Sequence, residues 1–419
     1  MQWRGLKPVK KTETLEYLQQ VIPGSVAGLV PGNLRTAGTG VRSLNSINVI
    51  GTGEDRFAKD AVESLAAAAG VTSVSSSNKL PRGAVKSALY GGLRLVGHDT
   101  TDLPLATAFD LACSGFVNRP SDFPSVMAQV TDVIMDAAAS QAATTFERWA
   151  YRLPDADNFD RTSIGGAGVI DGLDDYIDGE TVKQTRMQEE SKGWIEVNPS
   201  ANDIALTWLM VADPLKFGRF LEMIAELGSA GPRTLNRRMV ELLATNQPTI
   251  DEVPLFDNSH GNLMGSGSAP NDAALQAMAK LHAAQRAPGS EDPSGRFPSI
   301  ILVPDALRIT AETAFSTLLM VDGLRVARVE EQQSYFKDRI QVVSDPMLDS
   351  HSTTAWYSLI DPSTAGLRSF VYRYLAGYGP TGKSRSYFEP RRRSLVFGRD
   401  FVAGCALTKH RGVVKNPGA

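Results

Sequence analysis

The sequence predicts a mixed α+β protein, because its apolar residues follow two different patterns. A helical pattern begins near Ser121 and repeats at the intervals of one buried face: Val126, Val130, Val133 and Ile134. A continuous apolar run bounded by prolines, Ile300–Val303, is typical of a buried strand. Helices and strands then alternate in mixed order, which favours the α+β class.

The N-terminal 120 residues are predicted to form an arm followed by helices. Thr12 can cap a short helix that ends at Val21, and Gly24–Gly53 lacks a sustained apolar period, as an extended arm does. The helices that follow are expected at Glu54–Ala69, which Gly70 stops, at Pro81–Val96 and at Asp102–Ser114.

A two-stranded excursion is predicted at Asn158–Ser200. This stretch alternates Gly-rich turns and acidic residues with short β-prone runs such as Gly193–Val197. It has too few apolar residues to build a core of its own, so it needs a neighbouring molecule to rest on.

A long helix is predicted after the apolar, buried element Ile204–Val211. Asp213 supplies an N-cap and Pro214 the first helical position, and the helix should extend to about Asn246. Because Pro232 cannot donate a backbone hydrogen bond, we expect a kink or two consecutive helices at that point.

The second half is expected to combine two helices with several strands. The helices are Asn271–Arg286 and a segment that Pro304 opens and that reaches Ser316. Besides Ile300–Val303, strands are predicted at Arg339–Val343, Thr354–Ile360, Arg368–Leu375 and Leu395–Thr408.

Composition excludes several classes of protein. The 43 basic and 46 acidic residues give a net charge of −3, so the dense positive charge of a dedicated nucleic-acid binder is lacking. Cys113 and Cys405 match neither a disulfide framework nor a zinc site, which indicates folding in the reducing cytoplasm. No apolar run approaches the roughly 20 residues of a membrane span, and Met1–Val21 is too polar for a signal peptide.

The sequence contains no motif of a nucleotide, metal or hydrolase site. Gly51–Gly53, Gly165–Gly168 and Gly265–Ser268 lack the spacing of phosphate-binding loops and are interpreted as turns or linkers. An acidic cluster lacks the alternate spacing of an EF-hand loop, and a solvated loop is favoured: Asp171, Asp174, Asp175, Asp178 and Glu180. No histidines share the i, i+4 spacing of a zinc pair: His98, His260, His282, His351 and His410.

The remaining candidates also favour structural roles. A Ser-His-Asp hydrolase is disfavoured because no G-x-S-x-G elbow accompanies His98, and Cys113 lies in a helical apolar context typical of a buried thiol. The basic run Arg391–Arg393, with Lys383 and Arg385 nearby, is interpreted as a partner-facing charge cluster rather than a nucleic-acid site. We therefore predict no catalytic residue, cofactor or metal, and a large homo-oligomer in which copies cover each other's arm and loop.

Several segments are informative through their order along the chain, although none is diagnostic alone. They are Ser121–Pro124, Trp208–Leu221, Met239–Asn246, Leu255–Leu263, Leu302–Leu307, Thr354–Tyr357 with Asp361-Pro362, and Phe401–Ala406 through Arg411–Asn416. Together they resemble the tailed-phage major capsid proteins of the Hong Kong 97 fold, most of all the Mu-like major head subunits and capsid segments fused to a Clp-type protease. The resemblance covers about residues 95 to 419.

The resemblance implies a division of the chain and a set of partners. The parts are an N-terminal arm and helical extension (1–120), a helix leading into the body (121–157), an extended β-loop (158–203), a peripheral domain with a spine helix (204–256), an axial domain (257–365) and the C-terminal strands of the peripheral domain (366–419). It also implies that His260 is a hydrogen-bonding residue in a structural junction. The implied partners are other copies in pentamers and hexamers, a portal protein, scaffolding or cement proteins, and weakly held double-stranded DNA, in a virion assembled in the host cytoplasm.

Two alternatives remain open at the level of sequence. An encapsulin-type compartment shares the implied fold but encloses enzymes instead of a genome. An α/β enzyme whose site escapes single-sequence analysis belongs to a different class, and a chain that stayed monomeric at high concentration would favour it.

Overall fold

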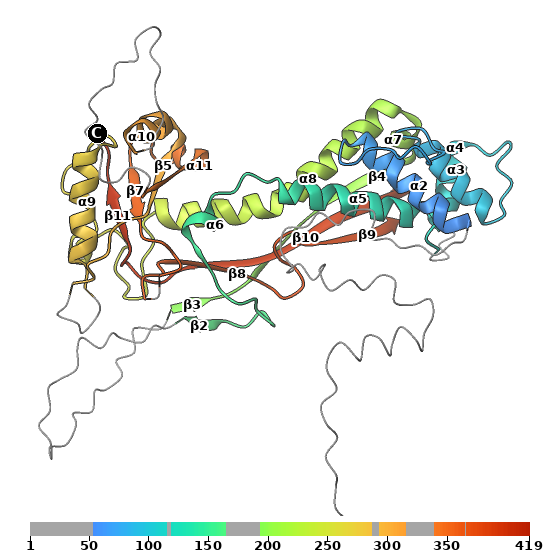
Figure 1. The fold of residues 1–419 in the computed structure, drawn as a ribbon. Coiled ribbons are helices and arrows are strands. Elements are labelled where there is room, and N and C mark those ends of the chain that lie inside the picture. The colour runs from blue at the N-terminus through green and yellow to red at the C-terminus, as the bar shows by residue number, and fades with distance from the viewer. Residues whose placement is uncertain (1–52, 115–118, 165–192, 287–292, 316–338, 365) are drawn as a thin grey trace, which may run out of the picture. The chain divides into compact units, whose positions relative to one another are not determined.

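The computed structural model describes residues 53–114, 119–164, 193–286, 293–315, 339–364 and 366–419, all of which belong to the compact unit Val41–Ala419. The predicted helix before Val21, most of the predicted arm, the Gly165–Gly168 loop and the acidic cluster after it lie outside these residues. The described part mixes helices with two larger sheets and a two-stranded one, so the predicted α+β class is confirmed (Figure 1).

The first helices form a bundle with one apolar core. They are α2 (Gly53–Ala68), α3 (Val85–Leu95), α4 (Leu105–Ser114) and α5 (Phe123–Ser140). The predicted periodicity of α5 is confirmed, since Val126, Val130 and Ile134 are fully buried in that core. Helix α3 begins four residues later than predicted because Gly83, with a φ of +74°, turns the chain before it.

The larger sheet contains five strands, ordered β1-β8-β10-β4, with β9 also paired to β10. Their bounds are β1 Tyr151–Arg152, β4 Asn198–Thr207, β8 Phe370–Tyr374, β9 Lys383–Glu389 and β10 Ser394–Leu407. Strand β10 is the central one: its first half lies between β4 and β9, and its second half pairs with β8. Strand β9 was not predicted, since its exposed, polar residues show no apolar alternation.

Helix α7 (Trp208–Ala212) leads into α8 (Pro214–Ala244), which packs against both α5 and β10. The predicted cap is confirmed, because the Asp213 carboxylate accepts a hydrogen bond from Leu215 N at 3.0 Å. The prediction of two consecutive helices is wrong, because α8 is continuous through Pro232. Its ribbon nevertheless bends along its length (Figure 1).

The two glycines near Pro232 are positions of close approach and do not end the helix. A Cβ atom on Gly228 would lie 2.4 Å from the carbonyl oxygen of Met135 in α5. One on Gly231 would lie 2.6 Å from the Phe401 ring in β10. Packing of the turn before Pro232 against α5 and β10 therefore offsets the hydrogen bond that Pro232 cannot make.

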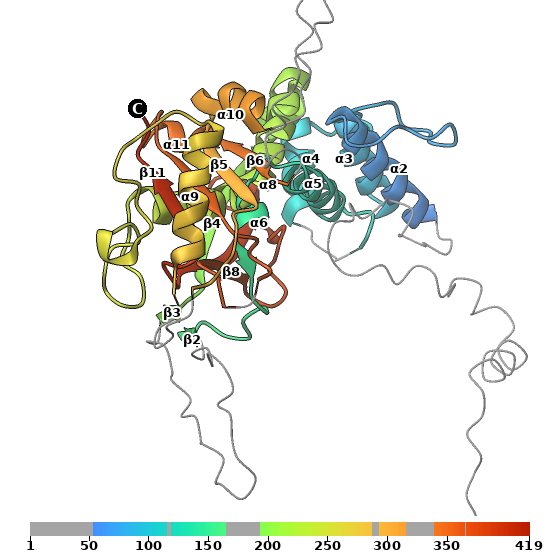
Figure 2. The ribbon, with the colours of Figure 1, turned by 60° about the vertical axis from the view of Figure 1, so that its left-hand side comes forward.

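The second sheet has four strands, ordered β11-β7-β5-β6. They are β5 (Ile300–Pro304), β6 (Gln341–Asp345), β7 (Trp356–Leu359) and β11 (Val413–Asn416). Helix α9 (Asp272–Ala284) packs on β11, and η3 (Asp305–Leu307), α10 (Arg308–Phe315) and α11 (Pro346–Asp349) adjoin β5 and β6 (Figure 2). The predicted buried strand is confirmed, since every residue of β5 is buried.

Two strands cross the boundaries of the predicted division of the chain, which itself stays a prediction. Strand β4 begins at Asn198, so the large sheet already starts inside the segment 158–203 that was assigned to the extended loop. Strand β11 pairs with β7 of the second sheet, so residues 366–419 do not all return to the first. Burial of apolar side chains favours this pairing, because Val413 and Val414 are fully buried in the second sheet.

The strands β2 (Thr162–Ile164) and β3 (Gly193–Ile195) form a hairpin that is hydrogen-bonded as a separate two-stranded sheet. The expected two-stranded excursion is thus present at its base, while its tip lies outside the described residues. One apolar cluster links α6 (Phe146–Trp149) and the second half of α8 with both sheets; it includes Leu235, Ile300, Tyr357, Phe370 and Phe401.

Candidate functional site

The two cysteines are not placed as nucleophiles. Cys113 is buried in α4, and burial raises the pKa of its thiol to about 12. Burial likewise raises the pKa of Cys405 to about 11, with the charge on Glu241 acting in the same direction and that of Arg238 opposing it. Both thiols are therefore protonated at neutral pH, and the predicted structural role of Cys113 agrees with its position.

Within the part of the chain that the structure describes, three histidines lie apart from any cluster of ligating groups. His98 and His351 are exposed. His282 is fully buried in α9, where its Nε2 lies 2.8 Å from the Ser358 hydroxyl in β7. Burial lowers the pKa of His282 to about 3, so its ring is neutral and serves to join α9 to the second sheet.

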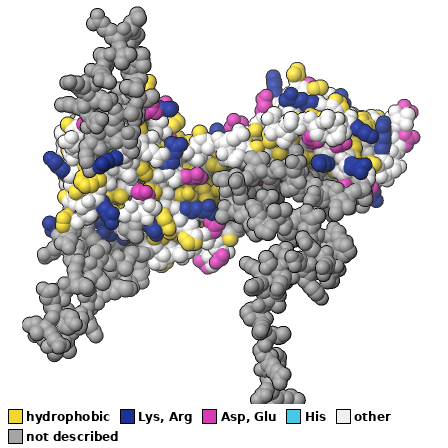
Figure 3. Space-filling model, viewed as in Figure 1, with side chains coloured by type: hydrophobic (Ala, Val, Ile, Leu, Met, Phe, Trp, Pro, Cys, Tyr) yellow, Lys and Arg dark blue, Asp and Glu magenta, His cyan; other side chains and the backbone are white. Residues whose placement is uncertain are grey.

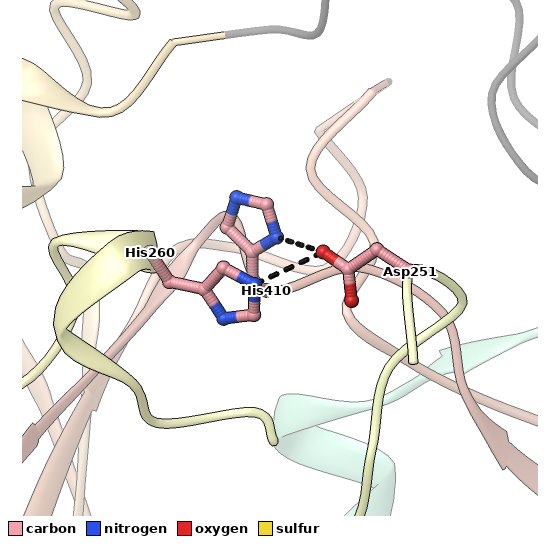
Figure 4. A group of neighbouring side chains, drawn as sticks. All are labelled: Asp251, His260 and His410. Atoms are coloured by element: carbon pink, nitrogen blue, oxygen red, sulfur yellow. Dashed lines mark hydrogen bonds and ion pairs between the residues drawn. The ribbon is translucent and has the colours of Figure 1, made fainter. Parts of the chain in front are cut away.

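The other two histidines meet Asp251 where the chain passes between the two sheets (Figure 4). His260 Nε2 lies 2.9 Å from Asp251 Oδ2, and His410 Nδ1 lies 3.3 Å from the same oxygen. The two imidazole rings are stacked, with centroids 3.9 Å apart and planes 9° from parallel. Sequence spacing could not reveal this group, because His410 is distant from the other two residues in the chain.

Local turns position these side chains. Asp257 caps the short helix η2 (Asn258–His260) by accepting a hydrogen bond from Ser259 N at 2.8 Å, and Gly261 closes the turn with a φ of +60°. His260 Nδ1 then faces the Leu255 carbonyl oxygen at 3.1 Å. The implied role of His260, a hydrogen-bonding residue in a junction, fits this geometry.

Both ring nitrogens of His260 face hydrogen-bond acceptors, a carbonyl and a carboxylate. Neither acceptor can donate, so a proton on each nitrogen satisfies both contacts and His260 carries a positive charge. His410 differs: burial, with the His260 charge acting in the same direction, lowers its pKa to about 4. Burial raises the pKa of Asp251, but hydrogen bonds from Thr249, Val253 and His260 outweigh it, so the net shift is downward.

Among the described residues, this is the group of three that could supply ligands to a metal ion. A metal bound to imidazole lies near the ring plane, about 2.1 Å from the nitrogen. Because the two rings are stacked and nearly parallel, a cation at that distance from both nitrogens would lie well outside both planes. The arrangement suits shared protons better than a shared metal.

A buried arginine holds the base of the β2–β3 hairpin against the large sheet. Arg373 of β8 donates to the Thr162 hydroxyl at 2.8 Å and to the Ile195 carbonyl at 3.5 Å. Only 6% of this residue is exposed, and burial lowers the pKa of its guanidinium. Opposite it in β10, a Cβ on Gly404 would lie 2.1 Å from the Glu196 carbonyl, so glycine permits the close crossing.

Large aromatic side chains are exposed beside this hairpin base. Phe159 is 56% exposed and Trp194 is 57% exposed. A tryptophan half in water on a strand outside the two main sheets is a feature of contact surfaces, where aromatic residues are enriched.

The basic run is paired within the chain. Arg392 lies 3.6 Å from Glu389, and Arg393 donates from Nε to Asp110 at 3.0 Å. Arg385 bridges Asp203 and Asp400 at 2.7 and 2.6 Å. On the face seen in Figure 3, Lys and Arg side chains are interspersed with Asp and Glu. These ion pairs reduce the net positive charge at Arg385 and Arg393, and the partner-facing role of the cluster stays a prediction.

The sequence matches the phage capsid protein family over residues 195–416, more than half of the chain. The matched region contains β4 to β11 with α7 to α11 between them, and so most of both sheets. This chain belongs to the phage capsid protein family. As a capsid protein it is a structural subunit of the virion shell, as predicted; the narrower Mu-like group stays a prediction.

Solved capsid structures are distantly similar to this capsid protein. The capsid of Ralstonia phage GP4 is 12% identical, covering 66% of this chain and 92% of its own, with a TM-score of 0.46. A structure from Mycobacterium phage Che8 is 12% identical, covering 65% of this chain and 91% of its own, with a TM-score of 0.41. A virus-like particle from Pyrococcus furiosus is 7% identical, covering 67% of this chain and 95% of its own, with a TM-score of 0.37. Among curated protein sequences, none matches this chain. No described helix is both long and apolar enough to cross a membrane.

Proposed function

We propose that this capsid protein is the major head subunit of a tailed phage, and that its copies form pentamers and hexamers enclosing double-stranded DNA. The observation that carries the proposal is the family match, because it extends over both sheets and the long helix between them. Assembly would take place in the cytoplasm of the bacterial host, together with a portal protein and any scaffolding or cement proteins.

Each part of the chain would have its own role in the assembled shell. Helix α8 would be the spine of a peripheral domain built on the large sheet, and the second sheet with α9 and α10 would be the axial domain, which meets its copies around capsomer centres. The β2–β3 hairpin would lie over a neighbouring subunit. Its firmly held base and its exposed Phe159 and Trp194 support that role, since a rigid support with exposed aromatics loses little entropy on binding.

Contact with the genome would be weak and non-specific. The chain has a net charge of −3, and several arginines already have carboxylate partners within the subunit. A shell that holds DNA by confinement needs few phosphate contacts, and contacts of that kind weaken steeply with salt. We also propose that the subunit has no catalytic role, because its thiols are protonated and its buried histidine is neutral.

Electron microscopy of particles purified from the producing bacterium tests this function. We expect closed shells containing nuclease-protected double-stranded DNA. Shells that contained a protein cargo and no DNA would favour an encapsulin-type compartment instead. A chain that light scattering showed to be monomeric at high concentration would contradict the shell function and favour an enzyme.

A variant pair tests the hairpin contact within that shell. Trp194→Asp places a charge on an exposed position and should leave the fold intact while reducing the yield of closed shells at least about tenfold, because the buried indole of an interface is commonly a hot spot. Trp194→Phe keeps an aromatic contact and is expected to assemble within about twofold of the natural chain. Circular dichroism checks the fold, and sedimentation measures the shells. Equal assembly of both variants would contradict the proposed contact.

A further inference from the structure

Three connections cross between the two sheets close to the Asp251, His260 and His410 cluster. The first leaves α8 and reaches α9, the second joins β7 to β8, and the third joins β10 to β11. Asp251 and His260 belong to the first connection, and His410 belongs to the third. The cluster therefore joins two segments of the chain that both lead from the large sheet to the second sheet.

Further hydrogen bonds tie the same segments together. Ile250 N donates to the Thr408 carbonyl at 3.3 Å, and Lys415 N donates to the Asn262 carbonyl at 2.9 Å. The buried amide of Asn262 donates to the carbonyl of Leu255 at 2.7 Å and more weakly to that of His410. Local separation of the two segments would break these bonds as a group.

The charge of the cluster depends on one proton. His260 is held by two acceptors and carries a positive charge, while the stacked ring of His410 is neutral and donates from Nδ1 to Asp251. One carboxylate then balances one imidazolium. A second proton, on His410, would place two positive rings at a centroid distance of 3.9 Å beside a single negative charge.

We propose that Asp251, His260 and His410 form a proton-operated clasp between the two sheets, closed while the stacked rings carry one positive charge and opened when both are charged. The clasp is a property of the subunit itself and does not depend on the proposed genome or partners. Opening would loosen the first and third connections and so change how the two sheets are joined.

The direction of the pH effect follows from His410. The closed clasp holds the pKa of His410 at about 4, whereas an imidazole freed by opening regains its ordinary value of about 6.5. At His410 the open form thus binds more protons, so the stability that a neutral His410 gives the closed form is fully present above about pH 6.5 and is lost as the pH falls towards 4. Asp251 stays ionised over most of this window because its own pKa is lowered.

Other charged groups around the cluster act on the same equilibrium. Arg411 lowers the pKa of His410 further, and it belongs to the same third connection. Asp257 lies on the first connection; hydrogen bonds from Ser259 lower the pKa of its carboxyl, and the His260 charge acts in the same direction. Lys415 of β11 lies over the Phe256 and Tyr357 rings, and burial lowers its pKa. None of these charges differs between the variants proposed below.

Hydrogen–deuterium exchange with mass spectrometry on the purified full chain tests the clasp. Exchange is compared at about pH 7 and about pH 4.5, after correction for intrinsic rates, in peptides covering residues 246–264 and 406–416. We expect the opening equilibrium in these peptides to rise at least about tenfold at the lower pH. A peptide from α5 serves as an internal reference.

Two variants and one control isolate the proton on His410. His410→Asn keeps a donor near Nδ1 but cannot titrate, and His260→Gln removes the first positive charge; both should reduce the pH-dependent rise to less than about threefold. His98→Asn changes an exposed histidine elsewhere and should behave like the natural chain.

Several results would overturn the clasp. One is the absence of any rise in the natural chain, and another is an equal rise in His410→Asn. Should His410→Asn fail to fold by circular dichroism, His260→Gln decides by the same criterion. A third adverse result is slower exchange of these peptides at neutral pH on addition of Zn²⁺ alone, because the cluster would then be a metal site.

Discussion

At the scale of single residues, Asn236 joins three elements of the capsid protein. Its side-chain oxygen accepts from the backbone nitrogens of Thr145 and Phe146, both at 3.1 Å, and its amide donates to Asp345 at 2.8 Å. Asn236 belongs to α8, Asp345 ends β6, and Phe146 begins α6. Asn236 and Asp345 are almost completely buried, so the polar network is shielded from water and fixes how these elements meet.

Replacing Asn236 with leucine should therefore be strongly destabilising. Leucine has a similar size but leaves the Asp345 carboxylate and two backbone donors without their buried partner, at a cost of about 3–5 kcal/mol. The midpoint of urea unfolding of the unassembled subunit measures the change. Arg233→Ala on the same helix removes an exposed ion pair with Glu226 and should change the stability by less than about 1 kcal/mol. Equal effects of the two substitutions would argue against the network.

At the scale of elements, the sequence correctly predicted a long helix at α8 but did not show whether that helix is interrupted at Pro232. Pro232 predicted a kink or a break, yet α8 is continuous through it, and each of the nearby glycines, Gly228 and Gly231, is required by a neighbour that approaches the helix. Single-sequence patterns report local preference, whereas the packing of α5 and β10 on α8 is tertiary information.

Two glycines of α8 provide a matched test of this explanation. Gly228→Ala should destabilise the subunit by about 2 kcal/mol or more, because its Cβ would lie 2.4 Å from the Met135 carbonyl and would push α5 away. Gly218→Ala should stabilise it by about 0.5–1 kcal/mol, because nothing lies within 4 Å and alanine favours the helix. Thermal unfolding of the unassembled subunit measures both changes. If Gly228→Ala were stabilising, the close approach of α5 would be wrong.

The same contrast explains which elements could be predicted. Helix α5 has a helical period of apolar residues, and β5 is a continuous apolar run between prolines, so local patterns alone predict both. Strand β9 is mostly polar and exists because β10 offers it an edge, a fact no local pattern contains. The clasp is hidden for a related reason, since His410 meets Asp251 only after both sheets have formed.

At the scale of the whole molecule, a shell subunit must keep its core intact while presenting a fixed surface to its copies. Arg373 contributes to both requirements, because it belongs to β8 of the large sheet and holds the hairpin base through Thr162 and Ile195. Within the part of the chain that the structure describes, no carboxylate pairs with it, and its Nε has no hydrogen-bond partner. Its burial therefore costs folding stability, and its two hydrogen bonds fix the position of the hairpin base.

Arg373→Met should separate folding from assembly. Methionine fills a similar volume and removes an unpaired buried charge, so the stability of the subunit should change by no more than about 1 kcal/mol. The hairpin base loses its two donors, so hydrogen exchange at residues 160–164 and 193–197 should rise, and the yield of closed shells should fall at least about fivefold. Arg161→Met removes only the exposed pair with Glu196 and should assemble within about twofold of the natural chain. Normal assembly of Arg373→Met despite a loosened hairpin would show that copies position this segment for each other, and that Arg373 serves the isolated subunit alone.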